Sequence, residues 1–116
     1  MNPSINGIYA AYLTGSALQG FAMLTFVNGN VVGVDSGGVK YDGTYTDATA
    51  GYAVKLKLTV PPRTGLVQGV TTGPQVDISE LAFELPLNFL TQPFLRVSTK
   101  YGPVNAKIVK LRELNG

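Results

Sequence analysis

The acidic residues are the first candidates for chemistry in this chain. Asp35, Asp42 and Asp47 lie close together in the sequence. A calcium-binding loop places oxygen ligands at alternate positions around a glycine and ends in a glutamate, and these aspartates do not follow that spacing. We expect them to solvate the surface or to cap turns. The sequence therefore predicts no metal site and no cofactor.

Glu80 and Glu84 form a second set of carboxylates. On one strand their side chains would share a face about 13 Å apart, because a strand rises by roughly 3.3 Å per residue. The two carboxyl groups of a glycosidase lie considerably closer together. A solvent-exposed outer face is the better interpretation of this pair.

The residue types that the chain lacks exclude several kinds of active site. The sequence contains no His and no Cys. Without His, the usual acid–base group at neutral pH is missing, and with it most zinc sites and Ser-His-Asp triads. Without Cys there is no disulfide, thiolate nucleophile or iron–sulfur ligand. These absences favour a protein that is not an enzyme, and the lack of Cys suits a cytoplasmic location.

Glycine-rich and basic segments do not predict binding of nucleotides or nucleic acids. GSALQG and GLVQGVTTG contain no Gly-Lys-Ser/Thr and do not open a helix, so a phosphate-binding loop has no physical basis. The net charge is only +2. A basic stripe could form from Lys55, Lys57, Lys107, Lys110 and Arg112. The aromatic residues that would have to stack with nucleotides share their faces with aliphatic residues, which indicates core packing instead.

The segment before the first charged residue, Asp35, resembles a targeting or membrane segment. It lacks a basic n-region, and Gly15, Ser16, Gln19 and Gly20 interrupt its apolar run. No window reaches the roughly 18 unbroken apolar residues of a membrane-spanning helix. Buried strands explain the run better, so we expect neither a secretory signal nor a contact with a membrane.

Turn signals and alternating residues predict consecutive hairpins. Asn28-Gly29 is a strong signal for a type I′ turn, because both residues tolerate positive φ. Ser36-Gly37-Gly38 predicts the next turn. The segment YAVKLKLTV gives the cleanest alternation of apolar and polar residues. Gly43 lies on the apolar face of its strand, where a bulge or a strong bend would fit.

The pattern as a whole predicts about eight strands and no helix. The predicted strands cover residues 7–15, 19–27, 30–35, 39–46, 52–60, 80–87, 93–101 and 106–114. Such a sheet bends until it closes, because closure removes exposed edges. We therefore predict one all-β domain over residues 1–116, a small lipocalin-like up-and-down β-barrel of about eight antiparallel strands. A two-sheet sandwich is the alternative.

Inward-facing aromatic residues give the site prediction with most weight. Barrels of this strand number either fill with side chains or hold one small ligand. A Tyr hydroxyl inside the barrel needs a partner from the protein or from a ligand. One interpretation is a filled core. The other is a cavity for a small apolar ligand, lined by Phe26, Tyr41, Tyr45, Val54, Leu56 and Phe83.

The sequence also resembles a known family, most clearly from about Asn6 to Val60. The positions that carry the resemblance are Gly7-Ile8-Tyr9, Asn28-Gly29, Val31, Gly33, Asp35, Tyr41, Gly43 and Tyr45. Their order and spacing resemble the GrlR-type family, negative regulators of type III secretion and their uncharacterised bacterial relatives. The resemblance implies a small lipocalin-like β-barrel that is cytoplasmic, non-enzymatic and often self-associating. A homodimer is therefore one expectation.

The resemblance further implies a regulator that sequesters a transcriptional activator without touching DNA. In the characterised regulators, a strongly acidic loop after the fourth strand contacts the activator. The matching residues here, 47–50, contain one acid, so acidic steering of a basic partner would be largely lost.

Two functional hypotheses follow. The first is a regulatory protein-binding barrel that uses the loop 47–51 and the apolar, flexible connection 65–75. Its proposed contact residues are Asp47, Thr49, Leu66, Val67 and Val70. The second is a carrier that binds a small apolar molecule or lipid in the barrel interior.

Overall fold

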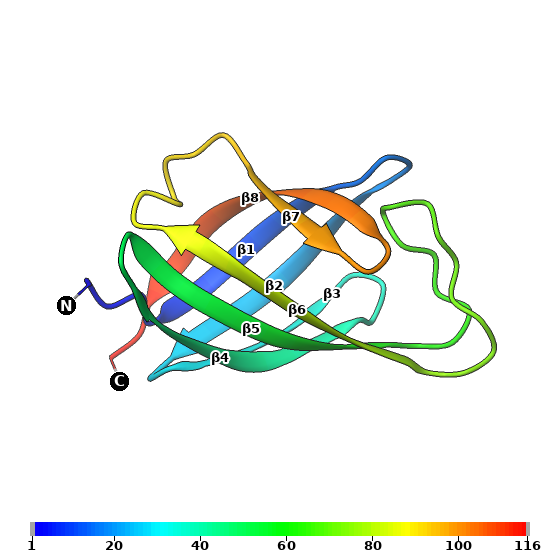
Figure 1. The fold of residues 1–116 in the computed structure, drawn as a ribbon, viewed down its shortest axis with the longest axis horizontal. Helices are drawn as coiled ribbons and strands as arrows, with labels where there is room; N and C mark the ends of the chain where they lie inside the picture. The colour runs from blue at the N-terminus through cyan, green and yellow to red at the C-terminus, as the bar shows by residue number, and fades with distance from the viewer. Residues whose placement is uncertain (1, 116) are drawn as a thin grey trace.

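The computed structural model describes residues 2–115 and contains one antiparallel sheet of eight strands (Figure 1). The strands are β1 (Gly7–Thr14), β2 (Gln19–Val27), β3 (Asn30–Asp35), β4 (Lys40–Ala48), β5 (Gly51–Val60), β6 (Asp77–Pro86), β7 (Leu95–Thr99) and β8 (Gly102–Glu113). The described residues form no helix. The prediction of an all-β barrel of about eight antiparallel strands is confirmed, and the alternative of a two-sheet sandwich is not observed.

The sheet closes almost completely. Its strand order is β6-β5-β4-β3-β2-β1-β8-β7, so the chain runs up and down between neighbouring strands, and β8 returns to pair with β1. β6 and β7 are the two ends of this order and face each other across a seam (Figure 1). Because the two strands are not neighbours in the hydrogen-bonded order, the wall is not sealed along this line.

The connections alternate between the two ends of the barrel. One end carries both termini together with the β2–β3, β4–β5 and β6–β7 connections, and we call it the terminal end (Figure 1). The opposite end carries the β1–β2, β3–β4, β5–β6 and β7–β8 connections, and we call it the mouth end (Figure 1). The molecule measures 43 × 25 × 24 Å, so the barrel is long enough for the two ends to differ in their packing.

The terminal end is packed solid by aromatic residues. The ring of Tyr9 lies 5.3 Å from that of Phe26 and 5.9 Å from that of Phe89, measured between centroids. Phe26 also contacts Tyr45 at 5.3 Å, and Tyr45 contacts Tyr52 at 6.5 Å. Aromatic pairs at these separations stabilise a core beyond the area that they bury. These rings therefore form the rigid part of the barrel.

The N-terminal segment supplies the hydrogen-bond partners of these tyrosines. The Tyr9 hydroxyl donates to the carbonyl oxygen of Ile5 at 2.7 Å, and the Tyr45 hydroxyl donates to Asn6 Oδ1 at 2.9 Å. The Tyr52 hydroxyl donates to a third acceptor, the carbonyl oxygen of Pro3. Buried tyrosine hydroxyls need such partners, and here the chain itself provides them. No ligand is required at this end.

The structure contains the hairpin turn predicted at Asn28-Gly29 but no bulge at Gly43. Asn28 and Gly29 have φ of 50° and 85°, as the predicted β2–β3 hairpin turn requires. Of the two alternatives predicted at Gly43, a bulge or a strong bend, the bulge is wrong, because the β4–β5 register runs through Gly43 without a shift. A Cβ at Gly43 would lie 1.8 Å from the carbonyl oxygen of Lys55. The glycine instead allows the backbones of β4 and β5 to approach closely.

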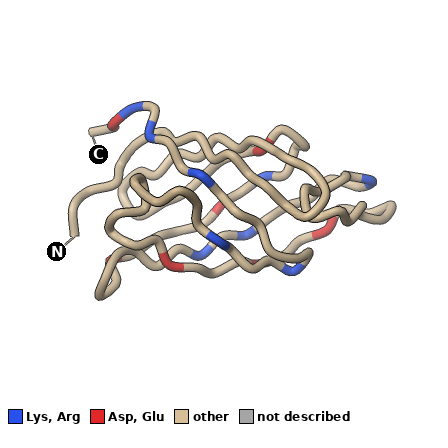
Figure 2. The backbone as a smooth tube through the Cα atoms, turned by 90° about the horizontal axis from the view of Figure 1, so that it is seen from above, with Lys and Arg blue, Asp and Glu red and all other residues tan. Residues whose placement is uncertain are grey.

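Charged side chains cover the outer wall on one side of the barrel. Asp42, Lys57 and Glu80 lie in one row across β4, β5 and β6, and all three are exposed. Glu84 is also exposed on β6, as predicted. Figure 2 shows cations and anions interspersed over the molecule instead of gathered in one patch.

Candidate ligand-binding cavity

The mouth half of the barrel is hollow. A cavity of about 260 Å³ lies there, lined by inward-facing residues of all eight strands. Ligand pockets commonly span roughly 300–1,000 Å³, so the cavity lies just below that range. Its walls are predominantly aliphatic and aromatic. A small apolar molecule fits both the size and the chemistry of this space.

Small side chains on one wall explain why the interior is not filled. Ala11 on β1 pairs directly with Ala22 on β2, and both line the cavity. Ala106 on β8 lines it as well, opposite Leu13 of β1. At these positions the inner face carries only a methyl group, whereas other inner-face positions carry larger side chains. The volume that a larger residue would occupy is left as cavity.

The aromatic cluster of the terminal end forms the floor of the cavity. Phe26 and Phe89 belong to the cluster and also line the cavity. Below them, Tyr9 and Tyr52 are 1% and 2% exposed. Burial, as the largest cause, raises the pKa of Tyr9 to about 12 and also raises the pKa of Tyr52. These hydroxyls therefore remain protonated donors at neutral pH.

The structure places the six predicted cavity residues in two groups. Four of them line the cavity: Phe26, Tyr41, Leu56 and Phe83. The other two, Tyr45 and Val54, pair with each other across β4 and β5 and belong to the packed core. Both face inward, but they lie nearer the terminal end, where the N-terminal segment and the aromatic cluster leave no space.

The β5–β6 connection folds over the mouth of the cavity. Within it, residues 64–72 form a narrow loop, which we call the strap, held by a bridge between Gly65 and Thr71. Leu66 is 9% exposed and lines the cavity together with Val67 and Gln68. The strap thus presents apolar side chains to the interior and closes part of the mouth.

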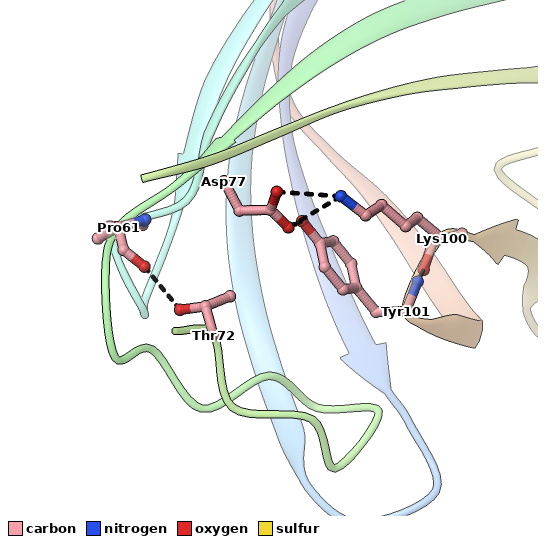
Figure 3. Close-up of polar contacts among 6 residues, drawn as sticks. Pro61, Thr72, Asp77, Lys100 and Tyr101 are labelled. Carbon is pink, nitrogen blue, oxygen red and sulfur yellow. Dashed lines mark hydrogen bonds and ion pairs between the residues drawn. The ribbon is translucent and has the colours of Figure 1, made fainter. Parts of the chain in front are cut away.

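Hydrogen bonds attach the strap to its surroundings. The backbone N–H groups of Ala17 and Leu18 both donate to the carbonyl oxygen of Val67, at 3.1 and 3.0 Å. At its base, Thr72 is buried, and its hydroxyl donates to the carbonyl oxygen of Pro61 at 2.8 Å (Figure 3). The sequence analysis described this connection as flexible. The structure shows it hydrogen-bonded to the β1–β2 loop.

This arrangement separates the five residues predicted to contact a protein partner. Asp47 and Thr49 are exposed at the terminal end, whereas the strap lies at the mouth end (Figure 1). Within the strap, Leu66 is buried, Val67 lines the cavity and Val70 is 41% exposed. The structure therefore does not bring these residues together into one surface, and Leu66 is not an exposed anchor.

A polar cluster spans the seam near the mouth. Lys100 Nζ lies 3.0 and 3.1 Å from the two carboxylate oxygens of Asp77, and the Tyr101 hydroxyl donates to the same carboxylate (Figure 3). Asp77 begins β6, and the other two residues form the β7–β8 turn. These contacts connect the two strands that lack ladder hydrogen bonds. We call Asp77, Lys100 and Tyr101 the latch.

Hydrogen bonding and burial shift the pKa values of the latch residues. The hydrogen bond from Tyr101, followed by that from Lys100, lowers the pKa of Asp77. Burial, followed by the hydrogen bond to Asp77, raises the pKa of Tyr101. The sequence analysis missed the latch, because nothing in the local pattern indicates that the chain meets itself across the seam.

Two pairs of polar side chains line the cavity near the mouth. Asp35 Oδ2 accepts a hydrogen bond from the Tyr41 hydroxyl at 2.9 Å. Gln68 Nε2 donates to Thr99 Oγ1 at 3.1 Å. Burial, followed by the charge of Asp35, raises the pKa of Tyr41, so this hydroxyl also remains protonated.

Asp35 has a double role in this structure. Its Oδ1 accepts hydrogen bonds from the backbone N–H groups of Gly37 and Val39, at 2.9 and 3.0 Å. These bonds hold the β3–β4 turn, as predicted for an aspartate at this position. The same carboxylate faces inward, because Asp35 pairs with the inward-facing Ala22. The alternation along 31–35 already placed Asp35 on the inner face, but the sequence analysis did not use it.

Residues 2–115 offer no candidate for a metal site or for a membrane-spanning helix. No group of three or more His, Cys, Asp or Glu residues in this part of the chain could hold a metal ion. Nor do these residues form a helix that is long and apolar enough to cross a membrane. A comparison of the sequence and structure with known protein families, curated proteins and solved structures finds no match.

Proposed function

We propose that this protein is a non-catalytic binding protein that holds a small apolar molecule in the mouth half of its barrel. The observation that carries the proposal is the apolar cavity of about 260 Å³ between the aromatic floor and the strap. A preformed cavity avoids the cost of reorganising the protein on binding. For a ten-carbon ligand we expect dissociation constants on the order of micromolar.

The chemistry of the cavity walls supports binding in preference to catalysis. Asp35 already accepts a hydrogen bond from Tyr41, and Thr99 already accepts one from Gln68. The Tyr41 hydroxyl is held in its protonated form, which is a poor nucleophile. Tyr41 is the hydroxyl that lies beside a carboxylate, but its raised pKa opposes ionisation, so the Tyr41–Asp35 pair is better suited to orienting a ligand than to attacking it.

Filling the cavity tests the proposal. The double variant Ala22→Leu/Ala106→Leu places two larger side chains on the hollow wall. The matched control is Ala82→Leu, which adds the same side chain on the exposed outer face of β6. The probe is N-phenyl-1-naphthylamine, an apolar dye whose fluorescence rises when it leaves water. Denaturant unfolding of each variant verifies that it is folded.

We expect the wild type and Ala82→Leu to bind the dye equally. The double variant should bind it about tenfold more weakly or worse, because a lost methylene-sized contact costs roughly 1 kcal/mol and overlap costs more. Equal binding by all three folded proteins would show that the dye lies outside the cavity. Absence of binding to the wild type would equally overturn the proposal.

A second candidate function is binding of a protein partner, as the resemblance to the GrlR-type family implies. The observation that favours it is the outer wall of β1, β2 and β3, whose outward-facing residues include no Lys, Arg, Asp or Glu. Tyr12, Met23, Val32 and Val34 are exposed there. A transcriptional activator or a second copy of the chain would bind this wall, and a cytoplasmic location belongs to the same proposal.

A charge placed on this wall tests the second candidate. Met23→Lys introduces it in the middle of the apolar surface, and Thr44→Lys on the exposed outer face of β4 is the control. Retention of a bacterial protein, or self-association in sedimentation, should be lost in the first variant and kept in the second. Equal behaviour of the two variants would remove this wall as the contact surface.

A further inference from the structure

We infer that the occupant of the cavity is an amphiphile whose polar head donates hydrogen bonds to Asp35, with a primary amine as the best head group and a carboxylate as the worst. The inference rests on the proposed function and adds the chemical class of the ligand. It follows from the charges and the unused hydrogen-bonding positions at the mouth.

The cavity carries one formal charge, and that charge is negative. Among the described residues that line it, Asp35 is the sole acid, and none is Lys or Arg. Asp35 is half-buried at the end of β3. A charge in such a partly buried position is screened less than one on the open surface. The charge of Asp35 therefore strongly affects the affinity for ligands with charged head groups.

The hydrogen-bonding capacity of Asp35 is not exhausted. A carboxylate offers about four acceptor positions on its two oxygens. Two positions are filled by the backbone N–H groups of Gly37 and Val39, and one by the Tyr41 hydroxyl. One acceptor position remains for a ligand. The Tyr41 hydroxyl keeps its proton but uses it in the hydrogen bond to Asp35. It too can therefore only accept a hydrogen bond from a ligand.

The cavity is also lined by neutral polar side chains, which cannot balance a negatively charged head: Gln19, Ser36, Thr64, Gln68, Thr99 and Tyr101. The Thr99 hydroxyl donates to the carbonyl oxygen of Gly102 at 2.7 Å. Gln68 retains one amide proton, because Nε2 carries two and one is given to Thr99. This neutral amide suits an alcohol. A carboxylate head beside Asp35 would be repelled and would meet no Lys or Arg in the lining, and Lys100 near the mouth is already paired with Asp77.

Three unbranched ten-carbon compounds with different head groups separate these possibilities. Decylamine, decanol and decanoate are titrated by calorimetry at neutral pH, the two charged compounds below their micelle concentrations and decanol below its solubility limit. We expect decylamine to bind about tenfold or more tightly than decanoate, as expected for one charge interaction in a partly buried site, with decanol in between. The net charge of the protein is +2, so non-specific attraction to its surface would produce the opposite order.

Asp35→Asn is the decisive variant. Its amide oxygen can still accept from the backbone N–H groups of Gly37 and Val39, so the turn is preserved. The amine-to-carboxylate preference should fall to about threefold or less, while decanol binding changes little. Tyr41→Phe serves as the second variant, because it leaves the charge of Asp35 in place and frees an acceptor position. In it the preference for the amine should persist.

The outcomes distinguish the inference from the function on which it rests. If decanol binds the wild type but decanoate binds as tightly as decylamine, the inference is wrong and the proposed function stands. An amine preference that survives in Asp35→Asn would likewise overturn the assignment of Asp35. If none of the three compounds binds, the proposed function itself fails.

Discussion

At the scale of single residues, the smallest side chains determine the shape of this barrel. Ala11, Ala22 and Ala106 leave the mouth half hollow, because each contributes only a methyl group to the inner wall. Gly43 contributes no side chain at all, and the carbonyl of Lys55 occupies the space that a Cβ would need. Replacing these residues should therefore change the interior more than replacing larger residues on the surface.

Gly43→Ala should destabilise the protein by about 2 kcal/mol or more, because the new methyl group would overlap the β5 backbone. Gly65→Ala is the matched control, since nothing lies within 4 Å of a Cβ at that glycine. The control should change the free energy of unfolding by about 0.5 kcal/mol or less. Urea unfolding compares the two. Equal losses would mean that close backbone approach at Gly43 is not the cause.

The buried tyrosines predict a loss of stability at alkaline pH. In the unfolded chain Tyr9 ionises around its ordinary pKa of 10.0, whereas burial raises the folded pKa to about 12. The folded state therefore holds the proton more tightly, and its advantage disappears as the pH rises from 10.0 to about 12. The free energy of unfolding should be flat below this window and fall within it.

Tyr9→Phe tests the origin of that decline. The variant should reduce the alkaline slope, and it should lower stability by about 1 kcal/mol at neutral pH because the Ile5 carbonyl loses its donor. Tyr12→Phe on the exposed outer wall is the control, with little expected effect. An unchanged alkaline slope in Tyr9→Phe would contradict the assignment.

At the scale of elements, the seam between β6 and β7 is the weak line of the wall. Every other pair of neighbouring strands shares a hydrogen-bonded ladder. At the mouth end the seam depends on the latch, Asp77 with Lys100 and Tyr101. We therefore expect local opening to begin there, since few interactions resist it.

Asp77→Ala should speed up hydrogen exchange of the β6 backbone amides by about tenfold, because local opening costs less without the latch. Glu80→Ala, which removes another exposed carboxylate of β6, should leave the exchange unchanged. Since hydrogen bonds lower the pKa of Asp77, the latch is fully present above the ordinary value of 3.8 and weakens as the pH falls below it. Equal exchange in the two variants would show that the latch does not hold the seam.

The sequence alone predicted some features of these elements and not others. Alternation and turn residues are local signals, so the Asn28-Gly29 turn and the outward lysines of β5 could be predicted. The latch and the docking of the strap bring together distant segments, for which the pattern holds no signal. Local conformation was predictable and long-range contact was not.

Tyr41 and Tyr45 illustrate the same limit within the candidate site. Both lie on the inner face of β4, and alternation predicts no difference between them. Tyr41 lines the cavity, whereas Tyr45 is covered by the aromatic cluster and donates to Asn6. The period of a strand gives the face of a residue but not its depth along the barrel axis. That depth depends on what the N-terminal segment fills.

At the scale of the whole molecule, the barrel consists of a solid half and a hollow half. The aromatic cluster at the terminal end supplies dense packing and satisfied hydroxyl groups. The mouth half can then keep an apolar cavity, whose empty volume alone would favour collapse. The division of stability and binding between the two ends is the basis of the proposed function.

Nuclear magnetic resonance on methyl-labelled protein with bound decanol tests this division most directly. We predict intermolecular nuclear Overhauser effects from the alkyl chain to the methyl groups of Leu58, Leu81 and Val97, which line the cavity. The exposed methyl groups of Val32 and Val34 on the outer wall should show none. Effects confined to the outer wall, or absent from the lining methyl groups at saturating decanol, would contradict an apolar ligand site inside the barrel.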